Sequence, residues 1–100
     1  MSLATTAKPR FAEGQLVTTR LVYDKMGEND YFRKQISQSY TRYKNGDWGD
    51  LSEDDKKMND DAIANNNDRI LAKYNTCYGD IYIITEDDRS VTTILFSDEY

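Results

Sequence analysis

The stretch from Tyr82 to Phe96, YIITEDDRSVTTILF, decides the fold of this chain. It contains two segments rich in β-branched and aromatic residues, and the polar run EDDR at residues 86–89 separates them. Two such segments joined by a short polar loop predict an antiparallel hairpin. A hairpin is at best marginally stable alone in water, so its apolar faces need further strands or a helix. We therefore expect the rest of the chain to complete a sheet around it.

Four strands are expected in this sheet. The hairpin supplies two of them, at Asp80–Glu86 and Arg89–Phe96. Alternation of residues between two faces, with many β-branched side chains, predicts the other two at Gly14–Tyr23 and Arg69–Asn75. The long gap between these last two strands leaves room for helices.

Two amphipathic helices are expected in that gap. Residues 29–44 carry four apolar side chains at spacings of four, four and three residues, which is the stripe of a helix that packs on a core. Ser52 is in the N-cap position of a second helix, from about Glu53 to Asn65. The run Asn65-Asn66-Asn67 is expected to end this helix, because asparagine tolerates the left-handed conformation. These elements predict an α+β fold in the order β-α-α-β-β-β, with a mostly antiparallel four-stranded sheet and two helices packed on one face.

Aromatic residues near the end of the first helix have two possible roles. Tyr40 and Tyr43 are expected at the edge of the core, and a base-stacking platform with Arg42 is the alternative. In the run GDWGDL, residues 46–51, two glycines bracket the only tryptophan. We expect Trp48 to anchor this loop against apolar residues, whereas an exposed ring would be a candidate binding hot spot.

Length and charge limit the classes of function. One hundred residues, of which 38% are apolar and 31% charged, predict one domain at residues 11–100, preceded by a flexible arm at residues 1–10. A net charge of −5 disfavours direct binding to nucleic acid or to an anionic membrane. No apolar run is long enough to cross a bilayer, so a cytoplasmic location is expected.

The residue types present exclude several chemistries. The chain has no histidine, which excludes Cys-His and Ser-His catalysis and histidine-ligated zinc. Its single cysteine, Cys77, cannot form an internal disulfide and fits a reducing compartment. Asp47 and Asp50 lack the spacing of a calcium-binding loop. We therefore expect no metal and no cofactor.

Two motifs together resemble a known family. GDWGDL at residues 46–51, and IITEDDRSVTTILF at residues 83–96 followed by Glu99-Tyr100, are similar to motifs in small uncharacterised proteins carried on bacterial plasmids and related mobile elements. The resemblance covers about residues 11–100. That family usually has glycines where this chain has Asn66-Asn67, and often alanine at Asp87. The resemblance implies a bacterial cytoplasmic protein, and it implies no particular activity.

The favoured hypothesis is a non-enzymatic interaction protein, either a monomer or a small homo-oligomer. It would bind a protein partner and cover a basic nucleic-acid-binding surface by presenting aspartates in place of phosphates. Asp60 and Asp61 lie beyond the first turn of the second helix, where no cap explains them, and a merely solvated acidic face is the alternative. The candidate binding residues are Asp54, Asp55, Asp60, Asp61, Asp87, Asp88 and Trp48.

The alternative hypothesis is a ribonuclease-like toxin of the barnase or toxin–antitoxin type, to which the order of elements is similar. Glu86 would accept a 2′-hydroxyl proton and Arg89 would hold the phosphate, with Arg69 and Tyr82 as further candidates. The acidic net charge stands against this hypothesis. Arg89 would otherwise be a loop cation that offsets the acids before it.

Overall fold

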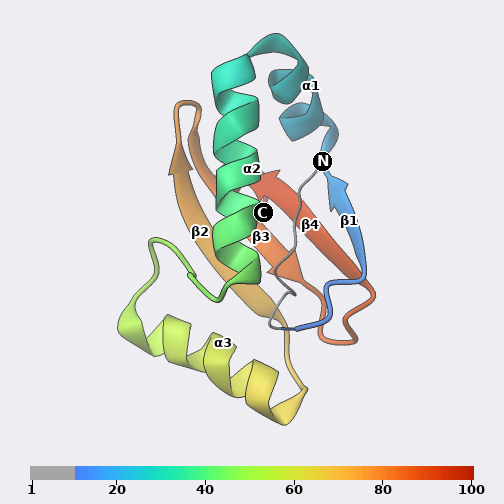
Figure 1. The fold of residues 1–100 in the computed structure, drawn as a ribbon, viewed down its shortest axis with the longest axis vertical. Coiled ribbons are helices and arrows are strands. Elements are labelled where there is room, and N and C mark those ends of the chain that lie inside the picture. The colour runs from blue at the N-terminus through green and yellow to red at the C-terminus, as the bar shows by residue number, and fades with distance from the viewer. Residues whose placement is uncertain (1–10) are drawn as a thin grey trace.

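The expected hairpin is present in the computed structural model, which describes residues 11–100. Strands β3 (Gly79–Thr85) and β4 (Val91–Phe96) pair antiparallel (Figure 1). Ile83 lies opposite Ile94 in this pair. Strand β2 (Ile70–Thr76) pairs antiparallel with β3 on its other side. The predicted arm at residues 1–10 lies outside the described residues.

The sheet is mixed, so the expectation of a mostly antiparallel sheet is only partly right. Its fourth strand, β1 (Gln15–Thr18), runs parallel to β4 and gives the strand order β1-β4-β3-β2. This pairing joins opposite ends of the described chain, and no local pattern specifies its direction. The α+β class and the four strands are as predicted.

The prediction of a strand over Gly14–Tyr23 is wrong in its second half, which belongs to helix α1 (Arg20–Glu28). Thr19 caps this helix, because its hydroxyl accepts a hydrogen bond of 3.3 Å from the Val22 amide. Val22 is fully buried and Met26, one turn later, packs against the core. The element order is therefore β-α-α-α-β-β-β, ending in a short 3₁₀ helix at Ser97–Glu99.

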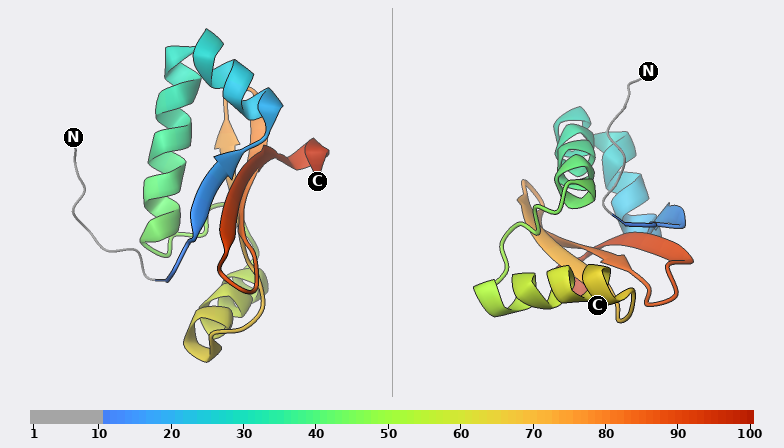
Figure 2. Two further views of the ribbon diagram at one scale, coloured as in Figure 1. Left: turned by 90° about the vertical axis from the view of Figure 1, so that its right-hand side faces the viewer. Right: turned by 60° about the horizontal axis from the view of Figure 1, so that its bottom comes forward.

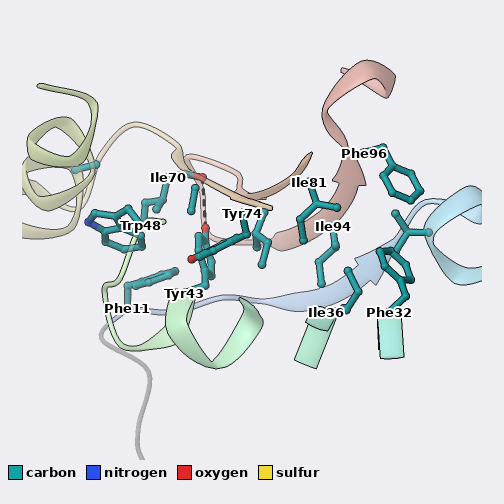
Figure 3. Packing of buried hydrophobic residues seen from close by; sticks show 14 residues of the cluster. Phe11, Phe32, Ile36, Tyr43, Trp48, Ile70, Tyr74, Ile81, Ile94 and Phe96 are labelled. Carbon is teal, nitrogen blue, oxygen red and sulfur yellow. Dashed lines mark hydrogen bonds between the residues drawn. The ribbon is translucent and has the colours of Figure 1, made fainter. Parts of the chain in front are cut away.

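Helix α2 (Asp30–Lys44) lies with α1 on one face of the sheet (Figure 2). Asn29 caps α2, because its side-chain oxygen accepts hydrogen bonds from the first two amides that follow Asp30. Phe32 and Ile36 are buried as the stripe predicts, and the ring of Phe32 stacks on that of Phe96 at 5.7 Å (Figure 3). This layer forms the main core.

Helix α3 (Glu53–Asn65) does not lie on that face, so the prediction of both helices on one face is not confirmed. It crosses the far end of the sheet beside β2, at the opposite end of the molecule from α1 (Figures 1 and 2). Only Asn59 and Ala62 of α3 are buried. Ser52 caps its start and Asn66, in the left-handed conformation, ends it, as expected.

The outer edge of β2 is covered by α3 and by the loop before it. The Asn59 side chain donates to the Leu71 carbonyl at 2.8 Å and accepts from the Leu71 amide at 3.2 Å. The Lys73 amide donates to the Trp48 carbonyl at 3.2 Å, and the Asp50 amide donates to the Lys73 carbonyl at 2.7 Å. These bonds occupy backbone groups that an edge strand would otherwise expose, and they fix α3 to the sheet.

Candidate protein-interaction surface

Helix α3 and the turn after it carry the densest acidic charge of the chain. Residues 53–68 contain six acidic residues and two lysines. Lys56 pairs with Glu53 at 3.4 Å and Lys57 pairs with Asp61 at 3.0 Å. Asp54 and Asp55 are exposed in the first turn, where the helix dipole favours acids. Both lysines of the helix are thus paired with its own acids, and the remaining carboxylates set the local field.

Asp60 has a structural partner, which corrects the expectation that nothing local explains it. Its carboxylate accepts a hydrogen bond of 3.0 Å from the Trp48 indole N–H. Charge reversal at Asp60 would therefore disturb the loop as well as the surface. Asp61 lies one residue further along α3 and forms an exposed ion pair with Lys57.

Trp48 anchors its loop, as the first of the two interpretations expects. Its side chain is 3% exposed and packs between Phe11, at 6.0 Å between ring centroids, and Tyr43, at 5.6 Å (Figure 3). The buried ring offers no surface to a partner in this conformation. The aromatic cluster also buries Tyr43 completely, so Tyr43 is a core residue and not part of a stacking platform.

The β3–β4 loop adds two more exposed acids beside the C-terminal end of α3. Asp87 and Asp88 are both exposed. Asp88 accepts a hydrogen bond of 2.9 Å from the Ser90 amide, and the hydrogen bonds from Ser90 hold the pKa of Asp88 below its ordinary value. Hydrogen bonds from Ser90 within the loop thus stabilise the charged form of Asp88.

Arg89 joins that loop to α3. Its backbone is in the left-handed region, with φ of 61°, and its guanidinium donates to five backbone carbonyls at 2.6 to 3.3 Å. These carbonyls belong to Ala62, Asn67, Asp68, Glu86 and Asp87. The last turn of α3 contains no basic residue, so Arg89 supplies from a distant loop the cation that a helix C-terminus favours. Arg89 therefore does more than offset the acids before it in the loop, because it also holds the loop to the end of α3.

The four residues of the ribonuclease hypothesis do not form one constellation around a substrate phosphate. Arg89 is already bonded to carbonyls, as described. Arg69 donates to the Tyr100 hydroxyl and lies 5.5 Å from the centre of that ring, and Tyr82 packs edge-on against Tyr100 at 5.6 Å. Tyr100 therefore gathers Arg69 and Tyr82 on the sheet face away from α2, while Glu86 is exposed in the β3–β4 loop.

A shallow groove between α3 and β2 was not foreseen from the sequence. Its volume is about 190 Å³. We call it the α3–β2 groove, and its lining residues are Leu51, Asp55, Met58, Asn59, Asp68, Arg69 and Leu71. These residues come from three separate segments, which hides the groove in the sequence. The sequence signal for the groove is Met58, an apolar residue among the mostly polar residues of α3, and the structure leaves it 61% exposed.

A buried polar chain runs through the core beneath α2. The Thr92 hydroxyl donates to the Glu13 carbonyl at 2.7 Å, so it must accept from Thr85, 2.7 Å away. Thr85 in turn accepts from the Tyr43 hydroxyl at 2.6 Å. Burial raises the pKa of Tyr43 above its ordinary value. These three hydroxyl groups therefore keep their protons at physiological pH, and their hydrogen bonds satisfy one another inside the core.

The side-chain carboxylate of Glu13, the residue whose carbonyl accepts from Thr92, is expected to weaken the fold at neutral pH. Burial raises the pKa of its carboxyl above the ordinary value, although the neighbouring Tyr40 side chain and the charge of Lys44 oppose this. An acid with a raised folded-state pKa is neutral in both states at low pH, and stability is lost as pH rises through the unfolded-state pKa, about 4.3, toward the folded one. We expect Glu13→Gln to be the more stable protein at pH 7.

The measurement is urea unfolding of both proteins across a pH series. The advantage of Glu13→Gln should vanish below the carboxyl range, where the wild-type side chain is also neutral. Glu28→Gln, which removes an exposed carboxylate 3.6 Å from Lys25, is the matched control and should show no such rise. A Glu13→Gln protein that is less stable than wild type at pH 7 would contradict the assignment.

The part of the chain that the structure describes contains no group of three or more acidic or cysteine side chains placed to hold a metal ion. None of the helices in residues 11–100 is long and apolar enough to span a membrane. Comparison of the chain with protein-family models, with curated proteins and with solved structures finds no match.

Proposed function

We propose that this chain is a non-enzymatic interaction protein that binds a basic partner protein through an acidic surface. The acidic surface comprises Asp54, Asp55, Asp61, Asp87 and Asp88. In line with the sequence resemblance, the protein would act in the bacterial cytoplasm as an accessory protein of a mobile element. There it would cover a nucleic-acid-binding site of its partner.

The observation that carries the proposal is the way α3 is held. The helix exposes most of its surface, yet side-chain contacts at residues 59–62, within about one turn, fix it to β2, to the Trp48 loop and to the β3–β4 loop. Asn59 bonds both backbone groups of Leu71, Asp60 bonds Trp48, and Arg89 bonds the Ala62 carbonyl. A charged surface on a fixed element loses little conformational entropy when a partner binds, which favours its use in recognition.

The position of the β3–β4 loop extends this surface. Arg89 holds the loop against the C-terminal end of α3 through bonds to Asn67 and Asp68. Asp87 and Asp88 therefore lie near α3, although they are distant from it in sequence. Acids from two segments on one side of the molecule fit a partner with a basic surface, because opposite potentials steer association.

The test is capture of partners from a bacterial lysate, followed by measurement of the affinity of the purified partner. Binding should weaken as salt rises from about 0.05 to 0.5 M, because exposed charges are screened beyond a Debye length. The variant Asp54→Asn/Asp55→Asn/Asp61→Asn should bind about tenfold more weakly or worse, since removing interfacial charges lowers the rate of association. Asp60 is left unchanged because it supports Trp48.

The matched control is Asp24→Asn/Glu28→Gln/Asp98→Asn, which removes the same charge from α1 and the 3₁₀ helix. It should bind like wild type, and both variants should stay folded in the absence of urea, because each first-turn acid lost from α3 costs only about 0.3 to 1 kcal/mol. A partner indifferent to salt and to the α3 variant would contradict the proposal. So would RNA cleavage by the purified protein that disappears in Glu86→Gln.

A further inference from the structure

We infer that the α3–β2 groove receives one apolar side chain of the partner, carried on a segment with lysine or arginine on both sides of it. This inference rests on the proposed function, since it names the chemistry of the partner at that site. In this inference the groove adds burial of an apolar side chain to the attraction between opposite charges.

The size of the groove suits a single side chain. Its volume of about 190 Å³ is smaller than the range of about 300 to 1,000 Å³ typical of pockets for cofactors and drug-sized ligands. The groove is partly open to solvent, so a side chain that projects from a partner can reach its lining residues. An anchor residue in a small pocket is the usual form of a protein-binding hot spot.

The walls of the groove include apolar groups that a partner would cover. Leu51, Met58 and Leu71 line it, and Met58 is 61% exposed. An unbranched methionine adapts its shape to different apolar partners, and its exposure on a helix leaves apolar area for a partner to bury. The Asn59 amide, also in the wall, is already bonded to Leu71 and makes no demand on a ligand.

The charge around the groove selects the residues that flank the anchor. Asp55 and Asp68 line it, and neither has an ion-pair partner among residues 11–100. The cation in the lining, Arg69, is held toward Tyr100 by a hydrogen bond and by its position over the ring. The groove therefore favours cations on either side of the anchor, and a nucleic-acid backbone would be repelled.

A peptide titration tests the inference. The probe is a short alanine-rich helical peptide with one central leucine and two lysines on each side, followed by amide NMR shifts of the full chain. We expect shifts at Met58, Asn59 and Leu71. A peptide with serine in place of leucine should bind at least about tenfold more weakly, because the loss of a buried leucine side chain lowers the binding free energy by about 1.4 kcal/mol or more, and about 1.4 kcal/mol is tenfold in affinity. A peptide with glutamates in place of the lysines should not bind.

The matched variants separate the groove from the charge. Met58→Gln, at an exposed position, should abolish the preference for leucine over serine, whereas Leu21→Gln, at an exposed apolar position on α1, should preserve it. Equal binding of the leucine and serine peptides would overturn the inference and leave the acidic-surface proposal standing. Failure of the leucine peptide to bind would also overturn it, and the capture experiment would still decide the proposed function independently.

Discussion

Replacing Arg89 with alanine is expected to lower the free energy of unfolding by about 2 kcal/mol. Hydrogen bonds from charged donors contribute about 1.5 to 3 kcal/mol in proteins, and Arg89 donates to five carbonyls. The side chain is only partly buried, so water will replace some of these bonds, and the five contributions will not add. The measurement is urea unfolding followed by far-ultraviolet circular dichroism.

Local opening should accompany this loss. The Ala62 and Asn67 carbonyls lie at the C-terminal end of α3, so amide exchange in the last turn of α3 should rise more than exchange in β3. Arg89→Lys should recover less than half of the lost stability. The compact ammonium group of lysine cannot bond all the carbonyls that the two ends of the planar guanidinium reach.

The matched control for Arg89 is Arg33→Ala, which removes an exposed arginine 2.7 Å from Asp30. An exposed ion pair contributes about 0 to 1 kcal/mol, so this change should be small. If Arg89→Ala were as stable as Arg33→Ala, the carbonyl contacts would contribute nothing, and Arg89 would again be free for a role in binding phosphate.

The elements that the sequence predicts well are those with local signals. Ser52 and Asn66 mark the ends of α3, and both act as predicted because capping depends on residues within one turn. The strands of the hairpin begin and end within two residues of their expected positions, because alternation and turn residues are also local. Helix α2 follows from its apolar stripe in the same way.

The features that sequence reasoning missed depend on contacts between distant segments. The run TTRLVY, residues 18–23, alternates like a strand, although α1 begins within it after the Thr19 cap. The helical spacing of Val22 and Met26, which both pack on the core, becomes apparent only when residues beyond this run are included. The role of Arg89 was hidden because backbone carbonyls leave no mark in a sequence. The parallel pairing of β1 with β4 and the α3–β2 groove likewise arise only when separate segments meet.

Replacing Trp48 with alanine is expected to destabilise the protein by about 3 to 4 kcal/mol, the larger of the two effects. Removing a buried aromatic side chain loses its transfer free energy and leaves a cavity, and truncations of this kind cost about 3 to 5 kcal/mol. Trp48 is 3% exposed and its loop also supplies two of the hydrogen bonds that cover the edge of β2. Unfolding is again measured by circular dichroism, since the variant lacks the only tryptophan.

The contribution of the hydrogen bond to Asp60 can be separated from that of the ring. Trp48→Phe keeps an aromatic ring but removes the indole N–H that donates to Asp60 at 3.0 Å. Asp60→Ala removes the acceptor and leaves that N–H unpaired. In a double-mutant cycle these two changes should be coupled by about 1 kcal/mol, whereas Trp48→Phe with Asp61→Ala should be additive, because Asp61 contacts Lys57 instead. Surface substitutions usually change the free energy of unfolding by no more than about 0.5 kcal/mol. If Trp48→Ala had so small an effect, the ring would be exposed in solution, and Trp48 would return to the candidate binding residues.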